Sequence, residues 1–195
     1  MIALPWHHQQ HRTKNCFIVP TEVKPSLIPE AGYGRFATAF IPKRTLLIKS
    51  PIISVDDINI YDPTKAIKIK NINELNYLVT RYQKQFKSLS KYDILNELRH
   101  FISFTVNNKH SMLLCSSGHV NHSIKNANLI PKISENYFCA FASKDIKPGD
   151  EIYCDYRVLR IPNQFDKYFK SYNLLTLNQF VDEIENSLKL KLSKL

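Results

Sequence analysis

Glycine is scarce in this 195-residue chain, with 4 residues against 10 Tyr and 11 Phe. That ratio argues against a collagen-like or low-complexity chain and favours a packed core. Acidic side chains are also in the minority, with 17 Asp+Glu against 27 Lys+Arg, so the formal net charge is +10. This excess favours a polyanionic neighbour such as nucleic acid, chromatin or an anionic membrane surface. Because 44% of the residues are hydrophobic and 23% are charged, disorder of the whole chain is excluded.

Cysteine is sparse too, and no pair has the C-x-x-C spacing of a zinc or redox motif. The four cysteines are Cys16, Cys115, Cys139 and Cys154. A disulfide framework needs a higher density, so we expect reduced thiols in a reducing compartment. His7, His8 and His11 could ligate a metal, but a short polar tail of this kind is more often solvated. No metal site is predicted.

Long apolar runs are missing as well. No stretch approaches the ~18 consecutive apolar residues of a membrane span, and the first 20 residues lack the apolar run of a signal peptide. The sequence therefore predicts a soluble protein without a membrane partner. Its length favours one domain, with room for a small appendage.

Short β-prone runs lie on both sides of a helical middle. The first group covers residues 35–37 and 45–48, with a turn at 41–44 between them. The second group covers residues 112–115, 137–142 and 151–154, with a turn at 147–150. This pattern predicts an α+β fold that is mostly β.

Apolar residues recur at helical spacing in three other segments. The first is residues 74–86, and the second runs to residue 105 after a cap formed by Ser90 or Asp93. The third begins with a capping box of Thr176 and Gln179 and carries a stripe that needs a partner surface, either in this domain or in a second protomer. We expect an irregular segment at 1–20, a domain at 21–157 with a helical insert at about 62–108, and a helical segment at 158–195.

Three motifs combine residue types that bind or position ligands. The first motif is Gly32-Tyr33-Gly34-Arg35-Phe36-Ala37. Its two glycines have no side chain, which allows the backbone to turn sharply or to approach a ligand closely. Asn121-His122-Ser123, with Asn126 and Asn128 behind it, gathers polar side chains that are costly to bury unless each is hydrogen-bonded. The run from 142 to 156 ends with Tyr156 just past a strand. Taken singly, the Gly32–Ala37 motif is more simply interpreted as a turn and the Asn121–Ser123 motif as a polar loop.

In this order and spacing, the three motifs resemble the SET-domain protein lysine methyltransferases. The first is similar to the family's G-x-G-x-F-A, the second to its N-H-S, and residues 145–156 to its D-I-x-x-G-x-E-[LI]-x-x-[DN]-Y. The resemblance covers roughly residues 21 to 156. It implies the SET-domain β-clip fold of short strands, with the helical insert, a C-terminal helix and a pseudoknot-like crossing in which residues 121–128 thread under the closing segment.

The resemblance also implies a role for each matching residue. Gly32, Tyr33 and Gly34, with Arg35 adjoining, would hold the methionine end of S-adenosylmethionine. Asn121 and His122 would contact the cofactor's amino group and adenine. Tyr156 would be the catalytic tyrosine, and it would also border the cofactor. It would orient the amine rather than take its proton, since a tyrosine has a pKa of ~10. The candidates for the walls of the lysine channel are Tyr153, Cys154, Tyr137 and Phe138, although aromatic residues in strands more often belong to the core.

The sequence departs from the family pattern at four places. The family usually continues N-H-S-C-x-P-N, whereas here Cys and Pro are absent and Asn128 comes one position late, so Asn126 could substitute for it. Gly118-His119-Val120 replaces the arginine or aromatic residue often found before N-H-S. No cysteine follows Tyr156, so a post-SET zinc module is not expected and residues 161–175 or the last helix would complete the channel. Cys154 replaces a Phe or Tyr, which predicts room for more than one methyl group.

We therefore expect an active S-adenosylmethionine-dependent methyltransferase acting on a lysine, most simply in a histone, and resident in the nucleus, with the cytoplasm as an alternative. There are three alternatives: a degenerate SET-fold module that binds chromatin or nucleic acid, a methyltransferase for a non-histone protein, and a β-clip domain without cofactor. Residues 65–91 hold seven basic residues and one acid, so they could contact nucleosomal DNA, although a solvated helix surface is the simpler interpretation. The C-terminal helix could form a dimer.

Overall fold

The computed structural model describes residues 16–57, 64–99, 102–106, 111–115, 118–134 and 136–192. The chain forms two compact units. The first comprises Met1–Ile53, Asp57–Ile67 and Cys115–Tyr156, and the second comprises Ser54–Asp56, Lys68–Leu114 and Arg157–Leu195. The fold is α+β and mostly β, as predicted. His7, His8 and His11 lie outside the described residues. None of the described helices is both long and apolar enough to span a membrane.

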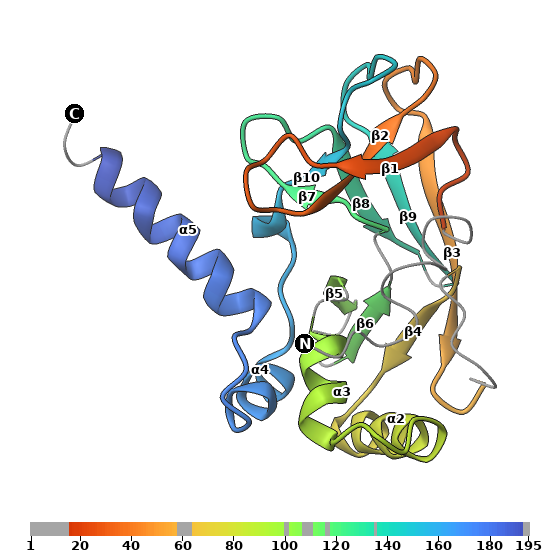
Figure 1. The fold of residues 1–195 in the computed structure, drawn as a ribbon, viewed down its shortest axis with the longest axis vertical. Helices are drawn as coiled ribbons and strands as arrows, with labels where there is room; N and C mark the ends of the chain where they lie inside the picture. Colours follow the sequence, from red (N-terminus) through yellow and green to blue (C-terminus); the bar gives the residue numbers. More distant parts are fainter. Residues whose placement is uncertain are drawn as a thin grey trace. The chain divides into compact units, whose positions relative to one another are not determined.

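The first unit contains a hairpin and a mixed sheet (Figure 1). The strands of the antiparallel hairpin are β1 (Thr21–Pro25) and β2 (Tyr33–Ala37). The order of the sheet strands is β3-β9-β8-β10-β7. Their bounds are β3 (Leu46–Ser54), β7 (Asn121–His122), β8 (Leu129–Ile133), β9 (Tyr137–Ala142) and β10 (Tyr153–Cys154).

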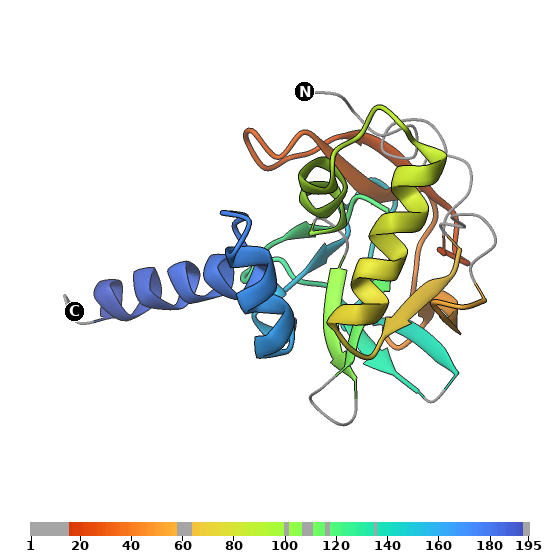
Figure 2. The same cartoon turned by 90° about the horizontal axis from the view of Figure 1, so that it is seen from below.

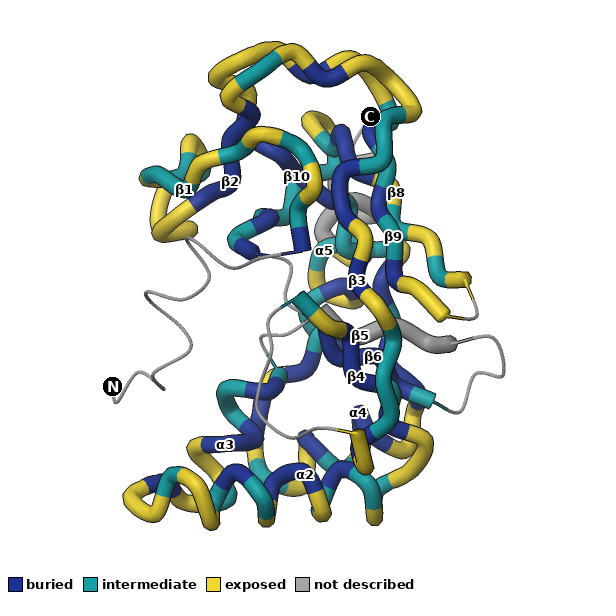
Figure 3. The backbone as a smooth tube through the Cα atoms, turned by 90° about the vertical axis from the view of Figure 1, so that its right-hand side faces the viewer, coloured by how far each residue is buried: buried dark blue, intermediate teal, exposed yellow. Residues whose placement is uncertain are grey.

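Burial in this unit follows the two-residue period of strands (Figure 3). In β9 the buried residues are Phe138, Ala140 and Ala142, and the residues between them are more exposed. β2 differs, because every residue after Tyr33 is buried. A strand covered on both faces can place backbone groups inside a site, and β2 carries the first motif.

The second unit contains the helices (Figure 2). Its elements are β4 (Ala66–Ile69), α2 (Ile72–Gln85), α3 (Lys91–Leu98), β5 (Ile102–Val106), β6 (Ser111–Cys115), α4 (Asn163–Lys170) and α5 (Leu177–Leu192). β4 carries the chain from the first unit into the second. β6 lies between β5 and β4, and α2 packs against α3.

The helix caps explain where two of these helices start. The Asn71 side chain accepts a hydrogen bond from the Glu74 backbone at 3.0 Å and begins α2. Ser90 and Asp93 form the predicted capping box of α3. The prediction that this helix continues to residue 105 is wrong: α3 ends at Leu98, and residues 102–106 form β5. β-branched residues at 102, 105 and 106 favour a strand there.

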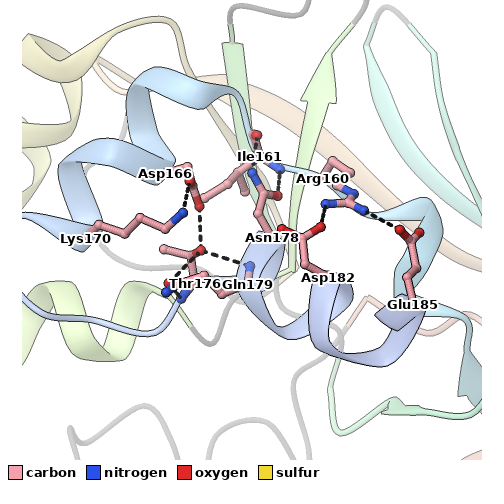
Figure 4. Close-up of polar contacts among 9 residues, drawn as sticks. All are labelled: Arg160, Ile161, Asp166, Lys170, Thr176, Asn178, Gln179, Asp182 and Glu185. Carbon is pink, nitrogen blue, oxygen red and sulfur yellow. Dashed lines mark hydrogen bonds and ion pairs between the residues drawn. The ribbon is translucent and has the colours of Figure 1, made fainter. Parts of the chain in front are cut away.

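The start of α5 is fixed by hydrogen bonds to the segment before α4 (Figure 4). Asn178 accepts a bond from the Ile161 N–H at 3.0 Å and donates one to the Ile161 carbonyl at 3.0 Å. Thr176 and Gln179 form the predicted capping box, and the Thr176 hydroxyl also donates to buried Asp166. These contacts anchor the C-terminal helix within its own unit.

Candidate active site

Strand β10 is threaded between two strands that precede it in the chain. Tyr153 and Cys154 pair in parallel with Asn121 and His122 of β7, and Cys154 also pairs with Leu129 of β8. The backbone therefore forms the predicted pseudoknot-like crossing, with residues 121–129 passing around the closing segment. A strand paired on both edges has few unsatisfied backbone groups and is held in one register.

Asn128 closes this crossing, whereas Asn126 does not. The Asn128 amide donates to the Glu151 carbonyl at 2.9 Å and accepts from the Tyr153 N–H at 2.9 Å. Asn128 is buried, and Asn126 is exposed in a turn. The extra residue in the loop is absorbed by that turn, so the late asparagine makes contacts that the expected substitute does not.

Tyr156 is held at both ends by the segment that carries the second motif. Its backbone N–H donates to His122 Nδ1 at 2.9 Å, and its hydroxyl donates to the Val120 carbonyl at 2.6 Å. The two rings lie 5.2 Å apart. Because Nδ1 accepts a hydrogen bond, a neutral His122 carries its proton on Nε2. Burial raises the pKa of Tyr156 well above its usual value, so its hydroxyl stays protonated at neutral pH.

Glu151 lies five residues before Tyr156, and its side chain forms a hydrogen-bond network that the sequence did not predict. Its Oε1 accepts from Ser26 Oγ at 2.8 Å and from Asn121 Nδ2 at 2.9 Å. Its Oε2 accepts from the Leu27 N–H at 2.7 Å and from the Tyr153 hydroxyl at 2.8 Å. Burial acts to raise the pKa of Glu151, but these hydrogen bonds outweigh burial and lower it, so the carboxylate is ionised at neutral pH.

The two glycines of the first motif serve different purposes. A Cβ on Gly34 would lie 2.1 Å from Glu151 Oε1, so only glycine leaves room for the carboxylate. Gly32 has φ +73, which favours glycine, and no described atom lies within 4 Å of its Cβ position. Tyr33 between them is 41% exposed. Packing against Glu151 thus accounts for the glycine at 34, whereas the space around the Cβ position of Gly32 is open.

Arg35 is buried, and its side chain is used by the protein core. Its Nε donates to the Gly118 carbonyl at 2.8 Å and its guanidinium lies 5.0 Å from the Phe17 ring centroid. Burial lowers the pKa of Arg35 to about 10, which still leaves it protonated at neutral pH. Its backbone connects the motifs, since its N–H donates to the His119 carbonyl at 3.0 Å and its carbonyl accepts from Ile152 at 2.7 Å. The Arg35 side chain is thus used within the protein, and its predicted place beside the cofactor stays a prediction.

The structure brings only two of the four predicted channel residues near Tyr156. Tyr153 and Cys154 are buried in β10. Phe138 pairs with Ile133 at the other end of the β8–β9 hairpin, four residues from Leu129, which is about 13 Å along a strand. Tyr137 lies next to Phe138 and is 37% exposed, with Lys49 Nζ 4.6 Å from its ring centroid. Nothing in this placement favours Tyr137 and Phe138 as channel walls.

Cys154 occupies the position two residues before Tyr156. Burial raises the pKa of its thiol to about 12, so it is a neutral, small and inert side chain rather than a nucleophile. Among the described residues, no three His, Cys, Asp or Glu side chains are grouped so that they could hold a metal ion.

The donors and acceptors at Asn121 fit a cationic ligand group. Its Nδ2 lies within 3.0 Å of three acceptors, which are Ser26 Oγ, the Tyr33 carbonyl and Glu151 Oε1. No described residue donates to its Oδ1. The carbonyl oxygen of this half-buried side chain can therefore accept a hydrogen bond from an ammonium group. The amino group of S-adenosylmethionine is such a donor.

The comparisons with known proteins agree with this geometry. The SET-domain family model matches residues 32–157. This chain therefore belongs to the SET-domain family. No curated protein matches the sequence significantly.

Three solved structures to which the chain is similar have sequence identities of 20–21%. A chain of apo ctPRC2 in an autoinhibited state is 20% identical with a TM-score of 0.50, and the match covers 80% of this chain and 17% of that chain. A ctPRC2 chain bound to S-adenosylmethionine is 21% identical with a TM-score of 0.49, covering 80% and 17%. A chain of Chaetomium thermophilum Polycomb Repressive Complex 2 bound to GSK126 is 20% identical with a TM-score of 0.48, covering 78% and 17%. This chain thus spans about a sixth of each of those chains.

Proposed function

We propose that this protein is an S-adenosylmethionine-dependent protein-lysine N-methyltransferase and that its substrate is a histone. The observation that carries the proposal is the placement of Tyr156. Its backbone N–H is held by His122 of the N-H-S motif and its hydroxyl by Val120 just before that motif, at a threaded crossing in a chain of the SET-domain family. The nuclear location and chromatin context follow from this substrate and from the net charge of +10.

Tyr156 acts as an acceptor and not as a base. Its hydroxyl hydrogen is used in the bond to the Val120 carbonyl, so the oxygen lone pairs remain to orient a reacting amine. Because burial raises its pKa, it does not form a phenolate that could take a proton at neutral pH. The lysine must therefore arrive neutral, which a dry site favours by lowering its pKa. The cofactor supplies an electrophilic methyl group on a sulfonium.

The experiment is methyl transfer from labelled S-adenosylmethionine to histones, with mass spectrometry of the products. Wild type should transfer the label, and Tyr156→Phe should lower the rate by about 100-fold or more. Tyr92→Phe is the matched control, because Tyr92 is an exposed tyrosine of α3 and should retain the full rate. Equal rates for wild type and Tyr156→Phe would contradict the proposal.

The small side chain at Cys154 supports the addition of more than one methyl group. The same mass spectra report this directly. Wild type should give dimethyl- or trimethyl-lysine, and Cys154→Phe should shift the product toward monomethyl-lysine. Strict monomethylation by the wild type would overturn this part of the proposal.

The principal alternative is a SET-fold module that binds chromatin or nucleic acid without catalysis, which the altered loop at 121–128 and the net charge of +10 favour. Calorimetric titration with S-adenosylmethionine distinguishes the two, since a degenerate site would not bind it. A methyltransferase for a non-histone protein is the second alternative. It would be identified by label appearing in other proteins of a nuclear or cytoplasmic extract but not in histones.

We also propose that the insert contacts nucleosomal DNA. On α2, Tyr77 is 49% exposed and the Arg81 guanidinium lies 5.7 Å from its ring centroid. Lys84 and Lys87 are exposed at the end of the same helix and just after it. Residues 65–91 carry seven basic residues against one acid. A basic helix with an exposed aromatic ring suits phosphate contacts, which are sequence-independent and sensitive to salt.

The test is a double charge reversal, Lys84→Glu with Lys87→Glu. It should weaken nucleosome binding at low salt and flatten the dependence of affinity on salt, while methylation of a free histone peptide is unchanged. Lys43→Glu with Lys144→Glu makes the same charge change at two exposed lysines outside the insert and should have a smaller effect. Equal effects of the two pairs would indicate general charge attraction and not a docking face.

A dimer formed through α5 stays a prediction. The predicted apolar stripe includes Val181, which is buried, and Phe180 and Ile184, which are partly exposed. Light scattering at several protein concentrations measures the oligomeric state directly, and a mass that stays at 22.7 kDa would rule the dimer out.

A further inference from the structure

The geometry points to Glu151 as a positioning residue of the cofactor site. We propose that its carboxylate holds the Asn121 amide so that Oδ1 faces the cofactor and accepts a hydrogen bond from its ammonium group. This inference rests on the proposed function, because it assumes that the site binds S-adenosylmethionine. It deepens that function by assigning a role to a buried acid that does not touch the reacting atoms.

The orientation of the Asn121 amide depends on what surrounds its nitrogen. The Tyr33 carbonyl and the ionised Glu151 carboxylate can only accept hydrogen bonds, and both lie within 3.0 Å of Nδ2. A flipped amide would replace an N–H···O bond to each of these two acceptors with an oxygen–oxygen contact, which is repulsive and strongest at the ionised carboxylate. The carboxylate therefore keeps the nitrogen facing inward and the oxygen facing the ligand.

The same carboxylate anchors the segment between β1 and β2. Ser26 Oγ and the Leu27 N–H donate to its two oxygens, and the Ile28 N–H donates to Ser26 Oγ at 3.0 Å. This segment leads directly into Gly32 at the start of the first motif. One buried acid thus couples the two chain segments that are expected to hold the amino acid end of the cofactor.

The charge of Glu151 adds to this effect. The carboxylate is 2% exposed and lies 2.9 Å from Asn121 Nδ2, so solvent screens it little. A cation bound at Oδ1 of the same amide is attracted by this negative charge. The attraction acts on the ammonium group, which S-adenosylmethionine and the product S-adenosylhomocysteine share. It does not act on the adenosine half of either molecule.

The experiment measures the affinity of Glu151→Gln for two ligands by calorimetry. S-Adenosylhomocysteine carries the ammonium group, and 5′-methylthioadenosine has the same nucleoside without it. A glutamine at 151 brings an N–H donor against the donors at Asn121, Ser26 or Leu27, which favours the flipped Asn121 amide. We expect about 10- to 100-fold weaker binding of S-adenosylhomocysteine, as for loss of a hydrogen bond to a charged group, and unchanged binding of 5′-methylthioadenosine.

Glu22→Gln is the matched control, because Glu22 is an exposed acid of β1 and its replacement removes the same charge. It should leave both affinities unchanged. Equal losses for both ligands in Glu151→Gln would show that Glu151 only supports the fold, and no loss for either would show that it does not position Asn121; both results overturn the inference. Wild type that binds neither ligand would instead overturn the proposed function on which the inference rests.

Discussion

Replacing Asn128 with alanine should destabilise the protein by several kcal/mol, although Asn128 lies in a loop. The side chain is 4% exposed and is the partner of two backbone groups, the Glu151 carbonyl and the Tyr153 N–H, each at 2.9 Å. Alanine leaves both groups buried and unpaired. Each unsatisfied group costs ~1–3 kcal/mol, so the loss is ~2–6 kcal/mol. For a chain of this size, a loss of ~3 kcal/mol lowers the melting temperature by ~6–12 °C.

Urea unfolding followed by circular dichroism measures this loss. The midpoint should fall while the slope m stays the same, because the unfolded surface does not change. Asn126→Ala is the matched control, since Asn126 is exposed in the same loop and should change stability by less than ~0.5 kcal/mol. If Asn126→Ala destabilised the protein as much as Asn128→Ala, or more, Asn126 would be the residue that closes the crossing.

Three further predictions concern the network and the C-terminal helix. The pKa of Glu151 is lower in the folded protein than its ordinary value of 4.5, so its ionisation stabilises the fold above that pH, and this stabilisation is lost as the pH falls through the folded pKa. In urea titrations from pH 7 to pH 3, the stability gap between wild type and Glu151→Gln should narrow at the acid end, and a constant gap would refute this. Gly34→Ala places a Cβ 2.1 Å from Glu151 Oε1 and should destabilise the protein by about 1–3 kcal/mol in the same assay. Thr176→Val removes a helix cap and the bond to buried Asp166, so it should cost about 1–3 kcal/mol, whereas Arg160→Ala breaks only partly exposed ion pairs and should cost less than ~1 kcal/mol; the reverse order would contradict the assigned contacts.

The fold class could be predicted because its signals are local. The capping boxes at Ser90 and Thr176 depend on residues three positions apart, and both are present. The end of α3 was predicted too far along the chain, because Ile102 continues the apolar spacing of the helix although it begins a strand. β5 pairs with β6, the next strand in the chain, and the apolar spacing of residues 91–105 does not report that pairing.

In the candidate site, the sequence predicts only the residues that belong to a recognisable motif. Tyr156 and Asn121 were assigned from their place in a motif, but their contacts come from segments far apart in the chain. Glu151 stands within the closing motif, yet its role depends on Ser26, which is 125 residues away and belongs to no motif. Tyr137 is a candidate channel wall only as an aromatic residue of a strand, a kind of residue that is more often core, and it lies at the turn of the β8–β9 hairpin.

The threading of β10 between β7 and β8 also sets an order of events during synthesis. Residues 121–129 cannot close around Tyr153 and Cys154 until both have left the ribosome, and the Arg35 carbonyl must wait for Ile152. Pairings across such separations form late and slowly, because the chain loses the entropy of loop closure before the stabilising contacts form. A nascent chain that stops before residue 153 therefore has every residue of the first two motifs and no assembled site.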